Sequence, residues 1–226
     1  MKRRVWLTLL VPSVALADPP HADLPTREVS LLWDSAPVGQ ELLHASFSYR
    51  DLVDRKTEEQ LQSGLPVTLS LRVYVLREGQ KEPIALSVRS CRVVYDLWDE
   101  VYRIKIVAPE SKPKPDGKPV IPERNAAAVS VDGVLRQCAE AKTLPIVSRG
   151  VLVPRVRYFL GVLAEVNPVS PQMQDEMRRW VTRPPGATGI GPQDALFGSF
   201  ALLFVRDLAG ADRTVRFRSR SFVAKE

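Results

Sequence analysis

The feature that most constrains the fold is a regular alternation of side chains between Leu65 and Arg77. Apolar and mostly β-branched residues fill every second position, and more polar residues fill most of the positions between them. A period of two with this composition indicates a β-strand with one buried face. The buried face is predicted to consist of Val67, Leu69, Leu71, Val73 and Val75.

Two further strands are expected directly after this one. Residues 84–95 carry apolar side chains on one face, and residues 101–108 follow a short reversal at 96–100. The connections are too short for parallel crossovers, so the three strands should form an antiparallel meander.

The rest of the chain adds more strands and a few helical stretches. A strand is expected over 155–166, where a helix is the alternative because an apolar run satisfies either period. Residues 57–64 are predicted to form a helical turn ended by glycine, and 109–124 a proline-rich surface excursion. The other strands are expected at 29–33, 45–53, 195–205 and 213–223, and helices at 130–142 and from Ser170 to Val181.

Seven or eight mostly antiparallel strands with two helices predict the fold class. It is a mainly β, antiparallel β-sandwich-like domain with two short helices.

The N-terminus predicts export. Lys2-Arg3-Arg4 precede an apolar stretch from Val5 to Leu16, and Ala15-Leu16-Ala17 has the small-x-small pattern of a signal-peptidase site. The apolar stretch is shorter than the roughly 20 residues that a spanning helix needs, so a transmembrane anchor is the less favoured alternative. We therefore expect a signal peptide at 1–17, an arm with a first short strand at 18–44, and one β-rich domain at 45–226. The mature protein would be periplasmic or extracellular.

The charge excludes one class of partner. The net charge is +6, and removal of Lys2, Arg3 and Arg4 leaves 29 basic and 26 acidic residues, a net charge of +3. This excess is too small to predict nucleic-acid binding through phosphate neutralisation.

The chain has two cysteines and two histidines. In an oxidising compartment Cys91 and Cys138 are either joined by a disulfide or remain two buried thiols. His21 and His44 are too few for a histidine-rich metal centre. We expect no cofactor and assign no catalytic residue, because Ser199 lacks the glycine spacing of a nucleophile elbow.

The first candidate ligand-binding site is a row of three arginines near the C-terminus. Arg216, Arg218 and Arg220 share one face of the last predicted strand, opposite Val215 and Phe217. Their guanidinium groups would lie about 7 Å apart and could bind phosphates or carboxylates. The alternative is a solvated edge strand that is protected from aggregation by its charge.

The second candidate is the reversal that carries Asp96, Trp98 and Asp99, with Glu100 beside them. Carboxylates on a hairpin tip could bind a cation, act as acid and base, or bind a sugar together with the aromatic ring. The alternative is that aspartate suits turns because its side chain bonds the nearby backbone.

The motif Gly64-Leu65-Pro66-Val67, followed by an alternating strand and then by Tyr95-Asp96-Leu97-Trp98-Asp99-Glu100-Val101-Tyr102, resembles an uncharacterised family of exported bacterial proteins that is described as a domain of unknown function. The resemblance covers about residues 45–220. It implies a β-rich periplasmic or secreted protein and transfers no chemistry to any residue.

These observations favour a non-enzymatic, exported envelope binding or accessory module. It would dock an anionic polymer or an envelope protein through the three arginines. A hydrolase or carbohydrate-active enzyme using Asp96, Asp99 or Glu100 is one alternative, and a structural or assembly component is the other. The oligomeric state is left open.

Overall fold

The computed structural model describes residues 24–35, 41–109, 123–168 and 211–224. In chain order its elements, including the 3-10 turns η1 and η2, are β1 (Thr26–Arg27), β2 (Ser30–Trp33), β3 (Leu42–Ser48), η1 (Arg50–Leu52), α1 (Arg55–Gln62), β4 (Val67–Arg77), β5 (Pro83–Asp96), β6 (Val101–Val107), β7 (Glu123–Ala128), α2 (Val131–Cys138), β8 (Glu140–Ser148), η2 (Arg149–Val151), β9 (Arg157–Val166), β10 (Arg213–Ser219) and β11 (Phe222–Val223).

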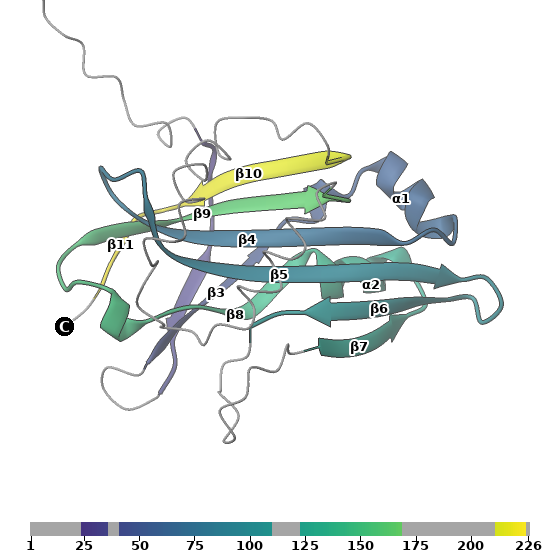
Figure 1. Ribbon diagram of the computed structural model, residues 1–226, viewed down its shortest axis with the longest axis horizontal. Helices are drawn as coiled ribbons and strands as arrows, with labels where there is room; N and C mark the ends of the chain where they lie inside the picture. Colours follow the sequence, from purple (N-terminus) through teal and green to yellow (C-terminus); the bar gives the residue numbers. More distant parts are fainter. Residues whose placement is uncertain (1–23, 36–40, 110–122, 169–210, 225–226) are drawn as a thin grey trace, which may run out of the picture.

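The strands among the described residues form two sheets. The large sheet has the order β1-β10-β9-β4-β5-β6-β7, with β11 also paired to β9, and the small sheet has the order β2-β3-β8. Every pairing is antiparallel except that of β1 with β10. The small sheet lies behind the large one and crosses its strands obliquely (Figure 1). The predicted mainly β fold with two short helices is confirmed.

The apolar core lies between the two sheets, and the predicted alternation builds it. Leu71 and Val73 of β4 and Val162 of β9 are fully buried on the face toward the small sheet. Leu43 and Ala45 of β3 meet them from the other side. The ambiguous segment at 155–166 is a strand, because β9 pairs along its length with β4.

The prediction that β4 is half-buried is wrong, because its second face is buried as well. Tyr74 is fully buried there, and Leu163 of the neighbouring β9 is 1% exposed. Arg72 of β4 and Glu165 of β9 form an ion pair at 3.0 Å on this face, with side chains that are 4% and 2% exposed. The polar character of this face therefore arises from an internal pair rather than from contact with water.

The α1 helix begins two residues before the helical turn predicted at 57–64, and it ends just before Gly64 as predicted. The Asp54 side chain accepts a hydrogen bond from the Thr57 amide at 2.9 Å, which caps the first turn. Gly64 follows the last turn with a φ of +79°, a conformation that glycine adopts without steric cost.

The helix predicted over 130–142 is shorter in the structure. It ends at Cys138, and Glu140 already begins β8. Apolar residues continue from α2 into β8, so the sequence pattern does not mark the point where the helix ends and the strand begins.

The strands β7 and β3 also differ from the sequence prediction. The β7 strand lies partly in the expected surface excursion, and its sequence Glu-Arg-Asn-Ala-Ala-Ala shows no alternation of apolar side chains. The β3 strand crosses the expected boundary at residue 44. The predicted helix from Ser170 and the strand at 195–205 lie outside the described residues.

Neither of the two described α-helices has the length and apolar composition needed to cross a membrane.

Candidate functional site

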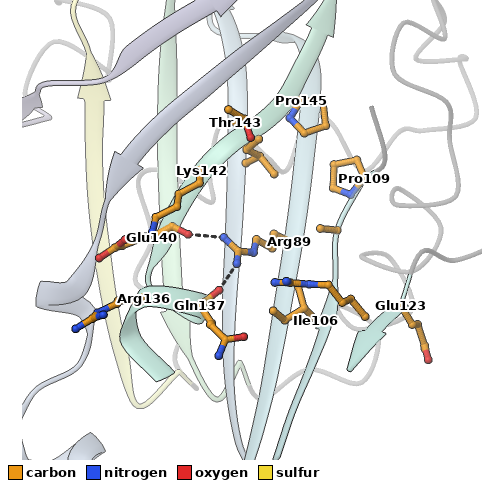
Figure 2. Close-up of a pocket in the computed structure, with 13 residues that line it drawn as sticks. Arg89, Ile106, Pro109, Glu123, Arg136, Gln137, Glu140, Lys142, Thr143 and Pro145 are labelled. Atoms are coloured by element: carbon orange, nitrogen blue, oxygen red, sulfur yellow. Dashed lines mark hydrogen bonds and ion pairs between the residues drawn. The ribbon is translucent and has the colours of Figure 1, made fainter. Parts of the chain in front are cut away.

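A cavity of about 630 Å³ lies between the sheets, beside the edge formed by β6 and β7. Its walls come from β5, the end of β6, the start of β7, the end of α2 and the first half of β8 (Figure 2). Elements from both sheets therefore meet at this cavity. The lining residues are Arg89, Ile106, Ala108, Pro109, Glu123, Arg124, Arg136, Gln137, Glu140, Lys142, Thr143, Leu144 and Pro145.

The central polar group of this cavity is the guanidinium of Arg89. The residue is only 9% exposed and projects from β5 toward the small sheet. Its Nη1 donates a hydrogen bond to the main-chain oxygen of Glu140 at 2.5 Å, and its Nη2 donates one to the main-chain oxygen of Gln137 (Figure 2). Both acceptors are neutral, so they orient the guanidinium without cancelling its charge.

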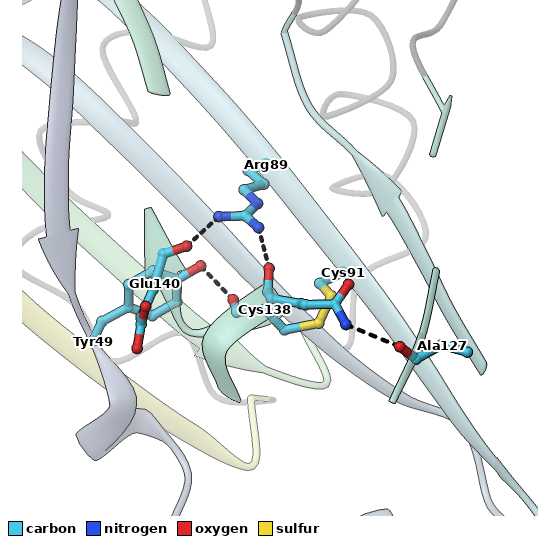
Figure 3. The surroundings of a disulfide bond; sticks show 7 residues. Tyr49, Arg89, Cys91, Ala127, Cys138 and Glu140 are labelled. Atoms are coloured by element: carbon cyan, nitrogen blue, oxygen red, sulfur yellow. Dashed lines mark hydrogen bonds between the residues drawn. A yellow bond between two sulfur atoms is a disulfide. The ribbon is translucent and has the colours of Figure 1, made fainter. Parts of the chain in front are cut away.

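A disulfide holds α2 against β5 next to Arg89. Cys91, two residues along β5 on the same face, is bonded to Cys138 at the end of α2, with a Cα–Cα distance of 5.5 Å (Figure 3). The Tyr49 hydroxyl donates to the main-chain oxygen of Cys138 at 2.5 Å. Burial raises the pKa of Tyr49 to about 12, so this phenol stays protonated and continues to donate.

A third contact fixes the outer side of α2. The Gln137 side-chain amide donates to the main-chain oxygen of Ala127 in β7 at 3.1 Å (Figure 3). The end of α2 is thus tied to β5 by a covalent bond and to β7 by a hydrogen bond. This arrangement keeps the cavity wall in one position.

The acidic side chains of the cavity wall already have cationic partners. Glu140 is bonded by Arg50 at 2.6 Å and by Lys142 at 3.2 Å. Burial raises the pKa of Glu140, but the hydrogen bonds from Lys142 and Arg50 outweigh burial and hold that pKa below its ordinary value. Glu123 is paired with Lys105 at 2.7 Å.

The cationic side chains outnumber these acids. Arg136 is paired with Asp132 on the same helix. Within the described ranges, no ion pair joins Arg89 or Arg124 to a carboxylate, and both line the cavity. The wall contains four cationic side chains against two acidic ones, so the cavity has a net positive lining.

This arrangement suits an oxyanion. A guanidinium is planar, stays charged, and matches the two oxygens of a carboxylate or a phosphate. The floor is apolar, with Ile106, Leu144 and Pro145 beside the cationic groups, and the volume lies within the range of about 300–1,000 Å³ that is typical of ligand sites. The site can therefore bind an acidic group that also carries an apolar part.

The structure does not present the three predicted arginines as a solvated row. Arg216 and Arg218 lie on the second face of the large sheet and are only partly exposed. The Arg218 guanidinium stacks 4.0 Å from the Phe159 ring and lies 3.9 Å from a carboxylate oxygen of Glu78. Arg220 follows the end of β10 and is exposed. The row expected to face solvent is thus half-buried at two of its three positions.

The structure places Asp96, Trp98 and Asp99 at the exposed β5–β6 tip. Asp96 accepts hydrogen bonds from the amides of Trp98 and Asp99 at 3.1 and 3.2 Å, and from Arg103 Nε at 2.8 Å. The bond from Arg103, followed by the backbone bonds, holds the pKa of Asp96 below its ordinary value. A general acid needs a raised pKa, so this shift does not favour Asp96 as the acid of the hydrolase alternative.

The arginine row and the acidic tip do not form one site. The β9 and β4 strands separate β10 from β5 in the large sheet. Neither candidate lines the cavity.

Sequence reasoning missed the cavity residues. One signal was present, since Arg89 is a charged residue on the face of β5 that also carries Cys91 and Val93. Arg124 fell inside the predicted surface excursion, where its charge had no structural context.

Comparison of the chain with protein-family models, curated proteins and solved structures returned no match.

Proposed function

We propose that this protein is a non-enzymatic, exported binding module of the bacterial envelope that holds an anionic group of its ligand in the cavity between its two sheets. The anionic polymer or protein expected from the sequence remains the partner. We place the binding site in the cavity beside Arg89 rather than at Arg216, Arg218 and Arg220.

One observation carries this proposal. Arg89 is a buried guanidinium that is held by two main-chain oxygens and by no carboxylate of the described residues. A buried charge without a counter-charge is costly unless a ligand supplies one. Arg124, in the same wall, also has no carboxylate partner there, which gives the ligand a second cationic contact.

The disulfide supports the proposed location. Disulfides persist in the periplasm and outside the cell, and they are rare in the cytosol. The bond between Cys91 and Cys138 is buried, two residues along β5 from Arg89.

Isothermal titration with pyrophosphate and with a triglutamate peptide tests the proposal. We expect saturable binding of at least one probe, and binding that weakens as salt is added. The variant Arg124→Gln combined with Arg136→Gln should bind at least about tenfold more weakly, since a hydrogen bond to a charged group contributes about 1.5–3 kcal/mol.

The matched control is Arg92→Gln. Arg92 lies on β5 three residues from Arg89, but it is exposed and points to the opposite face. Its loss should leave the affinity unchanged. Absence of binding to the unmodified protein, or an equal loss in the control and the cavity variant, would overturn the proposal.

A further inference from the structure

The β5–β6 hairpin projects from one end of the large sheet. The β4 strand begins at Val67, opposite Val93, whereas β5 continues to Asp96 before the chain turns. The hairpin forms the outermost part of the right-hand end in Figure 1. Trp98, at its tip, is 96% exposed, and the adjacent Leu97 is 64% exposed.

The tip is both rigid and acidic. The Asp96 side chain fixes the turn through the amides of Trp98 and Asp99, and Arg103 bonds both carboxylates. With Glu100, the tip has three carboxylates and one guanidinium, a net charge of −2. A large exposed ring on a turn held in one conformation loses little entropy on binding.

The cavity has the complementary properties. It is basic where the tip is acidic, and its floor of Ile106, Leu144 and Pro145 is apolar where the tip carries Trp98 and Leu97. Tryptophan and arginine are the residues most enriched at the centres of protein interfaces. Arg124 and Arg136 could bind the tip carboxylates, and either guanidinium could also stack on the indole.

A chain cannot fill its own cavity in this way. The tip lies at the Val101 end of β6, and the cavity lies at the Ile106 end. Five residues of strand separate these ends by about 17 Å, and the strand is held straight by β5 and β7. The tip that enters a cavity must therefore come from another molecule.

We propose that the β5–β6 tip of one copy of this chain docks into the basic cavity of a second copy. This inference rests on the proposed function, because it names the acidic partner of the same cavity. The contact joins two different surfaces, so repetition of it produces an open chain of molecules or a closed ring.

Sedimentation velocity of the full mature protein tests this assembly. The weight-average mass of the unmodified protein should rise with concentration. A tip variant, Trp98→Ala with Asp99→Asn, and a cavity variant, Arg124→Gln with Arg136→Gln, should each associate at least tenfold more weakly. An equimolar mixture of the two variants retains one intact tip and one intact cavity per pair, so it should form dimers and nothing larger.

The controls are Leu32→Ala and Arg92→Gln, which alter an exposed leucine and an exposed arginine outside the proposed contact. They should assemble like the unmodified protein, and circular dichroism should show every variant folded. A protein that stays monomeric at millimolar concentration would overturn the inference, as would a variant mixture that stays monomeric while the unmodified protein assembles. Pyrophosphate binding by a protein that stays monomeric would overturn this inference and leave the proposed function intact. Tip-dependent assembly without binding of either small probe would overturn the proposed binding of an anionic polymer and leave the docking of the tip intact.

Discussion

The main-chain oxygen of Glu140 accepts a hydrogen bond from the buried guanidinium of Arg89 at 2.5 Å. The same guanidinium donates to the main-chain oxygen of Gln137, so one side chain of β5 joins the end of α2 to the start of β8. The charge that organises this corner is also the charge that faces the cavity.

Replacement of Arg89 should separate its structural role from its binding role. Arg89→Met leaves two buried carbonyl oxygens without their donor, so we expect the free energy of unfolding to fall by about 1–3 kcal/mol. Arg89→Lys keeps the positive charge and can satisfy at least one carbonyl, so it should recover part of the stability and part of the pyrophosphate affinity. Urea denaturation and titration calorimetry measure the two effects. Equal affinities in the methionine variant and the unmodified protein would contradict the assigned role.

Reduction of the disulfide should lower the free energy of unfolding. The two cysteines are 47 residues apart, and a loop of this length corresponds to about 4 kcal/mol in the chain-entropy description. Urea denaturation with and without reductant measures the change. The double variant Cys91→Ala with Cys138→Ala is the control, because its unfolding should no longer respond to reductant.

The buried pair of Arg72 and Glu165 should be costly to break and inexpensive to remove as a whole. Glu165→Gln removes the negative charge that pairs with the buried guanidinium of Arg72, and we expect a loss of about 3 kcal/mol. The double variant Arg72→Met with Glu165→Leu should regain most of that loss. Glu59→Gln breaks the exposed pair with Arg55 and should change stability by less than about 0.5 kcal/mol. A double variant that is as unstable as the single one would refute this expectation.

Asp51 should make the fold sensitive to acid. Two hydrogen bonds from Arg27, at 2.8 and 2.6 Å, outweigh burial and hold the pKa of Asp51 below its ordinary value. Because the folded pKa lies below the unfolded one, this stabilisation is complete above the unfolded pKa and is lost as the pH falls through the folded pKa. Unfolding free energies measured from about pH 5 downward should decline less steeply in Asp51→Asn. Parallel pH profiles for the two proteins would rule this out.

The strands of the β4–β5–β6 meander were predictable because their signals are local. The alternation from Val67 to Val75 determines which side of β4 faces the core, and Asp96 begins a turn whose bonds reach only three residues along the chain. Gly64 likewise ends α1 through its own backbone conformation.

The cavity and the second buried face depend on contacts between distant segments. Arg72 looks like a solvent-facing residue until its partner, 93 residues later, is placed beside it by the pairing of β4 with β9. Arg89, Arg124 and Lys142 form one wall only because β7, α2 and β8 return to the same corner. No local pattern in the sequence contains that information.

The length of β5 has a mechanical consequence. This single strand extends from the cavity wall, through Arg89 and Cys91, to the acidic tip. It pairs with β4 from Pro83 to Val93 and with β6 from Ser90 to Asp96. A pull on the tip along the strand loads these ladders in shear, so their bonds resist together instead of opening one after another. The disulfide to α2 also transmits this force toward the small sheet. Tension applied to the hairpin is therefore shared by both sheets.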